Sequence, residues 1–162
     1  MNQPINLCPC GQDILGQRLS YAECCHRFHQ GDLPSHPELL MRSRYSAFVL
    51  RRHDYLIATH HPDFLNGLTR AILDSDNQTR WHGLQIINAK KNGQTGLVTF
   101  QAWYLENGKL DAIHEVSQFK WVNGKWLYTE GQQFSAILPK RNEPCLCHSG
   151  KKFKQCCIAL AN

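Results

Sequence analysis

The sequence predicts an α+β fold in which helices occupy the first half of the chain and a four-stranded antiparallel meander occupies the second. Before Trp81, apolar residues recur at spacings of three and four, which is typical of helices that bury one face. From Trp81 onward they recur at every second residue, and three Asn-Gly pairs separate the alternating segments. Helices followed by strands is an α+β order, because a parallel α/β sheet needs the two to alternate.

The eight cysteines form two clusters, one near each end of the chain, and each has a C-x-C pair followed by two adjacent cysteines. The expected metal ligands are Cys8, Cys10, Cys24 and Cys25 in the first cluster, and Cys145, Cys147, Cys156 and Cys157 in the second. Stretches this short cannot bury a hydrophobic core, and four thiolates around Zn²⁺ replace one. The spacing predicts two structural zinc sites, because four thiolates leave no open coordination position for catalysis.

The first predicted helix begins near Pro37 or Glu38, after a breaker-rich linker over residues 31–37. Its expected buried stripe is Leu40, Met41, Tyr45, Phe48 and Val49. Arg44 lies beside this stripe, so its side chain is compatible with either the buried or the exposed side. Two shorter helices are expected next, one over residues 55–60 with Asp54 as its cap and one after Thr69.

The meander is predicted from the Asn-Gly pairs Asn92-Gly93, Asn107-Gly108 and Asn123-Gly124, which favour type I′ hairpin turns. The expected strands are Trp81–Lys91, Gly96–Glu106, Leu110–Val122 and Lys125–Gln133. The second strand has apolar residues on both faces, which indicates a sheet covered by helices on one side and partly shielded on the other. The tryptophans Trp81, Trp103, Trp121 and Trp126 are interpreted as core and cross-strand packing.

The second cysteine cluster lies in residues 142–157, where Gly150 permits a tight turn and Phe153 is the large apolar side chain available to cover the metal. Nearby cations offset the negative charge of a Zn(Cys)4 centre. With both sites occupied, the formal net charge of +5 falls to about +1, which argues against general nucleic-acid binding. A local basic patch remains, made of Lys140, Arg141, Lys151, Lys152 and Lys154.

Composition and termini suggest a cytoplasmic protein. The 162 residues are 42% hydrophobic and 19% charged, which is typical of a globular chain of ordinary size. No apolar run approaches the roughly 18 residues that span a bilayer, and the first residues lack the basic and apolar regions of a signal peptide. In a reducing cytoplasm, clustered cysteines favour metal sites over disulfides.

Two sets of motifs connect the chain with known families. CPCG at residues 8–11 and CLCHSGKKFKQCC at 145–157 resemble the SEC-C zinc motif at the C-terminus of the translocase motor SecA. LLMRSRYSAFVL at 39–50, DYLIATHHP at 54–62 and TRWHGL at 79–84 resemble the YchJ family of bacterial proteins. This resemblance implies an NTF2-like (cone-shaped, curved-sheet) domain over residues 31–139, flanked by zinc motifs at 1–30 and 140–162. It implies no activity.

The chain departs from the motif at several positions. Leu146 and His148 replace the usual Pro and Gly of CPCGSG in the C-terminal copy, although neither replaced residue is a ligand. The N-terminal copy has a longer spacer between its cysteine pairs. Because the SEC-C motif tolerates His at its last position, His26 or His29 is an alternative to Cys25 as the fourth N-terminal ligand.

The predicted cone contains several candidate ligand-binding residues. Glu115 shares a strand face with Ser117 and Phe119, so it is expected to be a buried carboxylate with Arg42 or Arg44 as its partner. His60, His61 and Asp63 form a possible acid–base or metal cluster. Adjacent helical residues point about 100° apart, however, so a structural role is favoured for this pair of histidines.

Two functions from different classes are compatible with these patterns. The first is an adaptor without enzymatic activity, whose zinc motifs contact a protein partner; the resemblance implies the export chaperone SecB or the ribosome, with weak rRNA contact through the lysines. The second is a small-molecule-binding protein or enzyme that uses the cone, with Arg44, Tyr45, His60 and Glu115 as candidates. The adaptor is the favoured hypothesis. A homodimer is permitted by the two-sided apolar strands.

Overall fold

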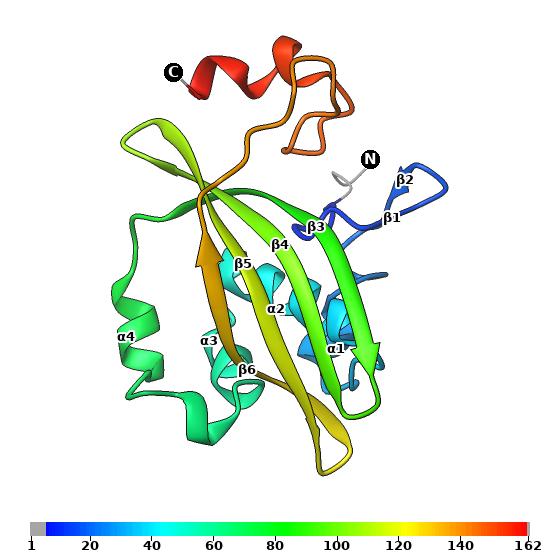
Figure 1. The fold of residues 1–162 in the computed structure, drawn as a ribbon, viewed down its shortest axis with the longest axis vertical. Coiled ribbons are helices and arrows are strands. Elements are labelled where there is room, and N and C mark those ends of the chain that lie inside the picture. Colours follow the sequence, from blue (N-terminus) through cyan, green and yellow to red (C-terminus); the bar gives the residue numbers. More distant parts are fainter. Residues whose placement is uncertain (1–5, 162) are drawn as a thin grey trace, which may run out of the picture.

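The computed structural model describes residues 6–161 and contains two small lobes attached to a curved sheet (Figure 1). The helices are α1 (His26–His29), α2 (Pro37–Val49), α3 (His53–Ala58) and α4 (Arg70–Ser75). The short strands β1 (Asp13–Ile14) and β2 (Gln17–Arg18) form a hairpin in the N-terminal lobe. The large sheet contains β3 (Arg80–Asn92), β4 (Thr95–Glu106), β5 (Lys109–Val122) and β6 (Lys125–Phe134). Three 3-10 helices complete the fold: η1 (Pro62–Phe64), η2 (Phe153–Gln155) and η3 (Cys157–Leu160).

Residues 1–5 and 162 lie outside the described range. The predicted absence of a signal peptide concerns residues 1–5. The predicted zinc motifs at 1–30 and 140–162 also include residues outside this range, namely 1–5 in the first motif and 162 in the second. Within residues 6–161, none of the helices has the length and apolar character needed to cross a membrane.

The four-stranded antiparallel sheet has the order β3-β4-β5-β6, which confirms the predicted meander and the α+β class. Asn107 and Asn123 have positive φ and precede a glycine that also has positive φ, as a type I′ turn requires. The first turn differs by one residue. Asn92 pairs with Thr95, so Gly93 and Gln94 are the central residues and Asn92 remains in the strand.

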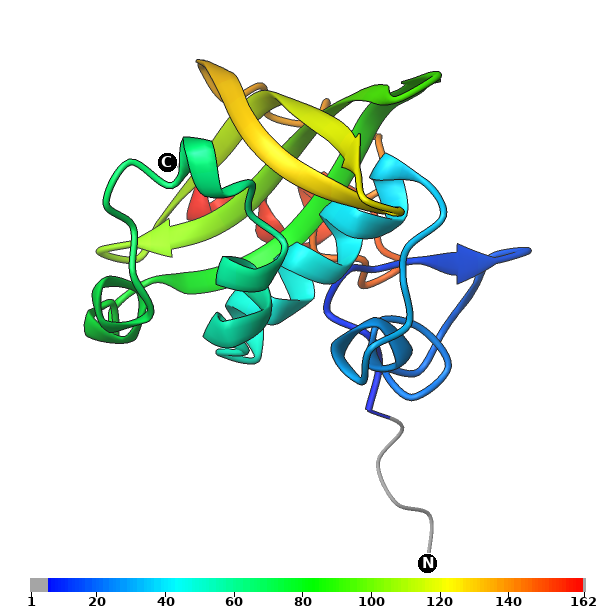
Figure 2. The same cartoon turned by 90° about the horizontal axis from the view of Figure 1, so that it is seen from below.

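The main core lies between α2 and the concave face of the sheet, and Figure 2 shows α2 running beneath the curved strands. Pro37 stands at the first turn of α2, and His36 caps the helix by accepting a hydrogen bond from the Glu38 backbone N–H at 3.1 Å. From this helix Leu40, Met41 and Tyr45 are buried against the sheet, as predicted. Phe48 and Val49 are only half-buried.

The short helices follow the predictions in part. Thr69 caps α4 by accepting a hydrogen bond from the Ile72 backbone N–H at 3.3 Å. The prediction for α3 was wrong in detail: Asp54 lies in the first turn, the capping position is Arg52, and the helix ends at Ala58. The carboxylate of Asp54 instead bonds Arg70 at 2.8 and 2.9 Å, so a contact between helices displaces the local cap.

The convex face of the sheet is covered at one end by the C-terminal lobe (Figure 1). Trp103 of β4 is fully buried there against Leu146 and Phe153, together with the cysteines of that lobe. This confirms that the second face is partly shielded. The C-terminal lobe shields this face, because its few large apolar side chains pack against Trp103.

Candidate functional site

The N-terminal cysteines lie together beside the middle of α2. All four are buried, and they belong to the same apolar cluster as Leu40, Met41 and Tyr45 of that helix. Cys8 Sγ lies 3.5 Å from Ser46 Oγ, while Arg42 Nη1 donates to the Cys10 carbonyl oxygen at 3.1 Å. The cluster is therefore anchored directly to the helix that supports the core.

The sulfur positions fit a tetrahedral metal. The four Sγ atoms lie within 4.8 Å of one another, with Cys10 and Cys24 3.6 Å apart and Cys24 and Cys25 3.8 Å apart. Four sulfurs that each lie about 2.3 Å from a central Zn²⁺ would be separated by about 3.8 Å. The donor set therefore matches the size and chemistry of a thiolate zinc site.

The two histidines predicted as alternatives to Cys25 lie outside the cluster. Both ring nitrogens of His29 are occupied, since Nδ1 lies 2.7 Å from the Tyr21 hydroxyl and Nε2 lies 2.8 Å from the Ser43 carbonyl oxygen. His26 packs edge-on against Tyr21. This geometry favours Cys25 as the fourth donor.

The C-terminal cysteines form a second cluster of the same size. Cys147 Sγ lies 3.6 Å from Cys145 and 3.5 Å from Cys156, and Cys156 and Cys157 are 3.8 Å apart. Polar groups surround the sulfurs: Ser149 Oγ donates to Cys156 Sγ at 3.4 Å, and His82 Nε2 lies 3.1 Å from Cys157 Sγ. Hydrogen bonds of this kind orient thiolate ligands and disperse their charge.

Four thiols held this closely cannot all ionise without a cation. The pKa of Cys25 is raised by its hydrogen bonds with Cys10, Cys24 and Cys8 and further by burial. Burial raises the pKa of Cys157, and the neighbouring cysteines raise it further. A bound divalent metal reverses this balance, because it stabilises all four negative charges at once.

The two lobes meet at β3. His148 takes a positive φ of 60°, the conformation that the usual glycine of the motif would supply, and its Nε2 donates to the Leu84 carbonyl oxygen at 2.7 Å. The same ring packs on Gly11, where a Cβ would overlap it. A Cβ on Gly83 of β3 would overlap the Leu146 carbonyl oxygen. The C-terminal lobe therefore sits directly on the strand and touches the N-terminal lobe.

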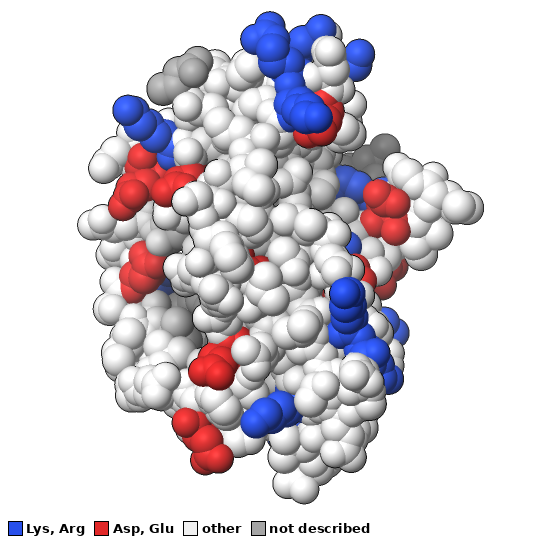
Figure 3. Space-filling view, in the orientation of Figure 1, with Lys and Arg blue, Asp and Glu red and all other residues white. Residues whose placement is uncertain are grey.

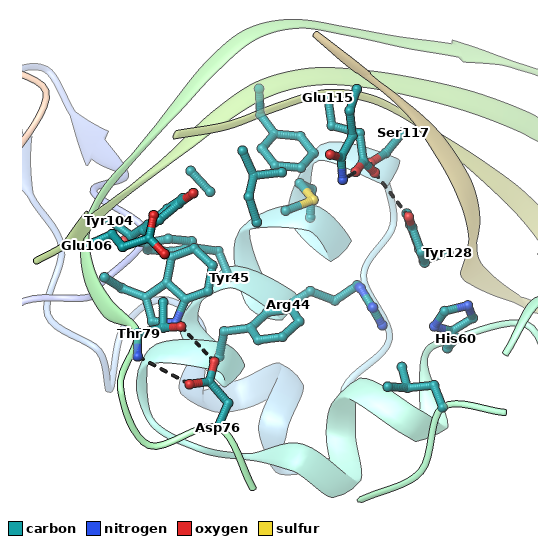
Figure 4. A pocket seen from close by; sticks show the side chains of 18 residues that line it. Arg44, Tyr45, His60, Asp76, Thr79, Tyr104, Glu106, Glu115, Ser117 and Tyr128 are labelled. Atoms are coloured by element: carbon teal, nitrogen blue, oxygen red, sulfur yellow. Dashed lines mark hydrogen bonds between the residues drawn. The ribbon is translucent and has the colours of Figure 1, made fainter. Parts of the chain in front are cut away.

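The NTF2-like cone contains a cavity of about 590 Å³ between α2 and the sheet (Figure 4). Its lining includes all four residues predicted for a cone site: Arg44, Tyr45, His60 and Glu115. Exposed Asp76 and Glu106 lie toward one end of the lining, whereas the buried polar side chains of Arg44, His60 and Glu115 lie toward the other (Figure 4). Ligand pockets have volumes of roughly 300–1,000 Å³, so the space is large enough for a small molecule.

Arg44 turns into the cone, which settles the orientation that the helical pattern left open. Its side chain is 5% exposed, and Nη1 donates to the Leu56 carbonyl oxygen at 2.9 Å and to Thr59 Oγ1 at 2.7 Å. The guanidinium carbon lies 4.8 Å from the centre of the Tyr128 ring. Burial lowers the pKa of Arg44 to about 10, so the guanidinium remains charged at neutral pH.

Glu115 is buried as predicted, but the predicted arginine partner was wrong. Its Oε1 accepts hydrogen bonds from Ser117 Oγ at 2.6 Å and Tyr128 Oη at 3.0 Å, and its Oε2 lies 3.4 Å from Gln133 Nε2. Arg42 pairs with Glu38 instead, at 3.0 Å. Neutral donors replace the expected ion pair: Ser117 lies two residues away on the same face of β5, and the pairing of β5 with β6 brings Tyr128 and Gln133 to the carboxylate.

The proposed cluster of His60, His61 and Asp63 does not form. His60 is buried and its Nε2 donates to the Phe64 carbonyl oxygen at 2.9 Å, while its Nδ1 has no hydrogen-bond partner in residues 6–161. His61 Nδ1 accepts from the Asp63 backbone N–H and so caps η1. The structural interpretation of this pair is consistent with these contacts, although His60 also lines the cavity.

Sequence reasoning missed two residues that organise these sites. Tyr128 contacts Arg44, Glu115 and His60: its ring lies under the Arg44 guanidinium and edge-on to His60 at 4.9 Å, and its hydroxyl donates to Glu115. His82 reaches the second cysteine cluster from β3, 75 positions away in sequence. His82 lies within the TRWHGL stretch at residues 79–84 and Tyr128 lies in none of the quoted motifs, but both contacts depend on long-range packing that no local pattern encodes.

Comparison with known proteins places this architecture in a family. A family model described as the YchJ middle NTF2-like domain matches residues 36–131, and the SEC-C motif matches residues 141–158. A UPF0225 protein of Shewanella sp. (strain MR-4) is 48% identical over 93% of this chain and 95% of its own length.

Two solved structures support the same assignment. The crystal structure of a SEC-C motif containing protein from Psychrobacter arcticus is 31% identical, with a TM-score of 0.68 over 94% of this chain and 96% of that one. The solution structure of a SEC-C motif containing protein from Rhodopseudomonas palustris is 28% identical, with a TM-score of 0.70 over 80% of this chain and 99% of that one. The chain therefore belongs to the UPF0225 family, in which a YchJ-like NTF2-like domain is combined with a SEC-C motif.

Proposed function

We propose that each cysteine cluster binds one structural Zn²⁺, so that the chain comprises two zinc-stabilised lobes (residues 1–30 and 140–162) around an NTF2-like domain (residues 31–139). The sulfur separations and the burial of the clusters support this assignment. Metal analysis of the purified chain is expected to find two equivalents of zinc. Cys10→Ser and Cys156→Ser are each expected to lose one equivalent, and retention of both equivalents would contradict the assignment.

The favoured function is an adaptor whose C-terminal lobe contacts an acidic protein surface. One observation carries it: five cationic side chains are exposed together on this lobe, Lys140, Arg141, Lys151, Lys152 and Lys154. Figure 3 shows the blue surface that gathers at the C-terminal end of the molecule. None of the five makes an ion pair within residues 6–161.

The exposed positive charge of this surface suits an anionic partner, because the five cations outnumber the two negative charges of a Zn(Cys)4 centre. The lobe's apolar side chains are buried on Trp103, so its outward face offers mainly charge and polar groups. Complementary charge of this kind increases the association rate and weakens with salt. By its resemblance to the SecA motif, the lobe has SecB and the ribosome as its first candidate partners, and ribosome binding would bring rRNA phosphates into contact with the lysines.

A binding assay with purified SecB and with purified ribosomes tests this function. The triple variant Lys151→Glu, Lys152→Glu, Lys154→Glu should lose binding at low ionic strength. The matched control reverses the same number of exposed charges on the sheet hairpins, with Lys90→Glu, Lys109→Glu and Lys125→Glu, and should retain it. Failure of the wild type to bind either partner at low salt would overturn the adaptor function, and binding to ribosomes alone would assign the surface to rRNA.

A second candidate function is binding of a small molecule in the cone. The cavity itself favours it, because about 590 Å³ of space reaches a buried arginine and a buried glutamate. This site lies on the concave side of the sheet, whereas the cationic lobe lies on the convex side. The two functions are therefore independent.

A further inference from the structure

The polar end of the cavity holds two buried charged groups, Arg44 and Glu115, that form no direct ion pair with each other. Arg44 and Glu115 are 5% and 7% exposed, and within residues 6–161 no carboxylate lies within 4.0 Å of the Arg44 guanidinium. Burying an unpaired charge is costly unless a partner of opposite sign is supplied. The chain compensates both charges in part, since Arg44 makes two hydrogen bonds and Glu115 accepts three, so what a ligand in the cavity can use is the hydrogen-bonding capacity that each group has left.

The guanidinium retains unused donors on the cavity side. Both of its hydrogen bonds to the described chain come from Nη1, which leaves the N–H groups of Nε and Nη2 without a protein acceptor there. A guanidinium binds a carboxylate through two parallel hydrogen bonds, and this geometry needs two neighbouring donors of that kind. Arg44 is therefore suited to a carboxylate.

Glu115 retains unused acceptor capacity. Its Oε1 accepts two short hydrogen bonds, but Oε2 has only the weak contact from Gln133 at 3.4 Å. A carboxylate offers about four lone-pair sites, so Oε2 is able to accept a donor from a ligand. Tyr128 contacts both charged groups: the Arg44 guanidinium lies over its ring, and its hydroxyl donates to Glu115.

The rest of the cavity is largely aromatic. Besides Tyr128, five aromatic side chains line it: Tyr45, Phe48, Trp81, Phe100 and Tyr104. Tyr45 and Trp81 meet edge-to-face at 5.8 Å, and Trp81 and Tyr104 at 6.0 Å, so these walls are held by mutual packing. Such a surface favours a ligand with an aromatic or aliphatic body.

From this arrangement we infer that the cone binds a small organic acid whose carboxylate contacts Arg44, whose adjacent hydrogen-bond donor contacts Glu115, and whose apolar body fills the aromatic part of the cavity. The inference rests on the second candidate function and gives it a ligand class. A 2-hydroxy or 2-amino acid with an aromatic side chain has all three features. The exposed rim carboxylates Asp76 and Glu106 are screened by solvent and oppose entry only weakly.

Three matched probes test this ligand class on the wild-type full chain by calorimetry or ligand-detected NMR. 3-Phenyllactate has the carboxylate and the donor, 3-phenylpropionate lacks the hydroxyl, and 3-phenylpropanamide lacks the charge. We expect 3-phenyllactate to bind at least about tenfold more tightly than the amide, since a hydrogen bond to a charged group accounts for roughly that ratio. 3-Phenylpropionate should lie between them.

Variants on α2 locate the effect. Arg44→Met, which keeps the length of the buried stem, should abolish the preference for the acid over the amide. Arg42→Met is the control, because Arg42 lies on the same helix but bonds Glu38 and the Cys10 carbonyl oxygen. If wild type binds all three probes equally, the ligand class is wrong and the cone remains a ligand site. If none binds at millimolar concentration, both the class and the second candidate function are overturned. The wild-type series decides the question even if Arg44→Met does not fold.

Discussion

His148 Nε2 lies 2.7 Å from the carbonyl oxygen of Leu84 and donates a hydrogen bond to it. This bond ties the C-terminal lobe to β3, and the ring that makes it also packs on Gly11 of the N-terminal lobe. Burial lowers the pKa of His148, so the neutral imidazole is favoured, with its proton on Nε2. His148 replaces the usual glycine of the SEC-C motif. Its side chain thus connects the C-terminal lobe both to β3 and to the N-terminal lobe.

Replacing His148 should loosen this junction. His148→Ala leaves the Leu84 carbonyl oxygen without its donor and is expected to cost about 1–2 kcal/mol of unfolding free energy. His148→Gly loses the same bond but relieves the positive φ of 60°, so it should be less destabilising than alanine by up to about 1 kcal/mol. Urea unfolding of the zinc-loaded proteins measures both. An alanine variant as stable as wild type would show that the bond contributes nothing.

Gly83 should tolerate no side chain. A Cβ there would overlap the Leu146 carbonyl oxygen, a backbone atom that cannot move away without shifting the whole lobe. Gly83→Ala is therefore expected to cost about 1–3 kcal/mol, as overpacking does elsewhere, and to increase hydrogen exchange in residues 145–157. Asn88→Ala on the exposed part of the same strand is the control and should change neither quantity. Normal exchange in Gly83→Ala would refute the close contact.

Loss of metal from the C-terminal lobe should expose Trp103. This residue is fully buried, packs against Leu146 and Phe153 of the lobe, and donates its indole N–H to Gln85 Oε1 at 2.8 Å. Chelation, or the Cys156→Ser substitution, is expected to shift tryptophan emission to longer wavelength and increase quenching by acrylamide. The same treatment of a Trp103→Phe variant should give a much smaller change. Unchanged emission after verified zinc loss would mean that the lobe stays docked without metal.

The sheet was predictable because its signals are local. Alternation sets the face of each residue, and Asn107-Gly108 and Asn123-Gly124 specify the turns on their own. The prediction of the first turn was wrong by one residue, because the sequence there is compatible with two turn positions. Asn-Gly at 92–93 is compatible with a turn shifted by one residue, and the register that pairs Asn92 with Thr95 selects that alternative.

In the two kinds of site, likewise, the sequence predicted the local features but not the contacts that depend on long-range packing. Cysteine spacing predicted which thiols come together, since all eight lie within two short stretches. The cone was predicted as a set of residues but not as a network. Glu115 was expected to pair with Arg42 or Arg44, whereas Tyr128, Ser117 and Gln133 surround the carboxylate. The alternating pattern places Glu115 on a buried face beside Ser117, but only the register between β5 and β6 brings Tyr128 and Gln133 to the carboxylate.

Stability should depend on pH through His60. Burial lowers the pKa of this histidine, and the nearby charge of Arg44 lowers it further. The folded pKa therefore lies below the unfolded value of about 6.5, so the stabilising contribution is complete above that pH and is lost as the pH falls toward the folded pKa.

A substitution separates His60 from the other histidines. His60→Gln keeps a donor for the Phe64 carbonyl oxygen but cannot titrate, so its unfolding free energy should fall less on acidification than that of wild type. One proton limits the difference in slope to about 1.4 kcal/mol per pH unit. Unfolding curves across the range in which zinc stays bound provide the measurement. Parallel pH profiles for the two proteins would show that His60 does not titrate differently on folding.

Tyr128 should contribute more through its hydroxyl than its half-buried position suggests. Burial raises its pKa and Glu115 raises it further, so the phenol stays protonated and donates to the Glu115 carboxylate at 3.0 Å. Tyr128→Phe keeps the ring over Arg44 but removes this donor, and a hydrogen bond to a buried charge contributes about 1.5–3 kcal/mol. We expect a loss of that size in unfolding free energy. Ser117→Ala removes the other donor to Oε1, and the double variant should lose a different amount from the sum of the two, because both bonds share one oxygen. Strict additivity would mean that the two hydroxyls act independently and that Tyr128 does not organise the polar groups around Glu115.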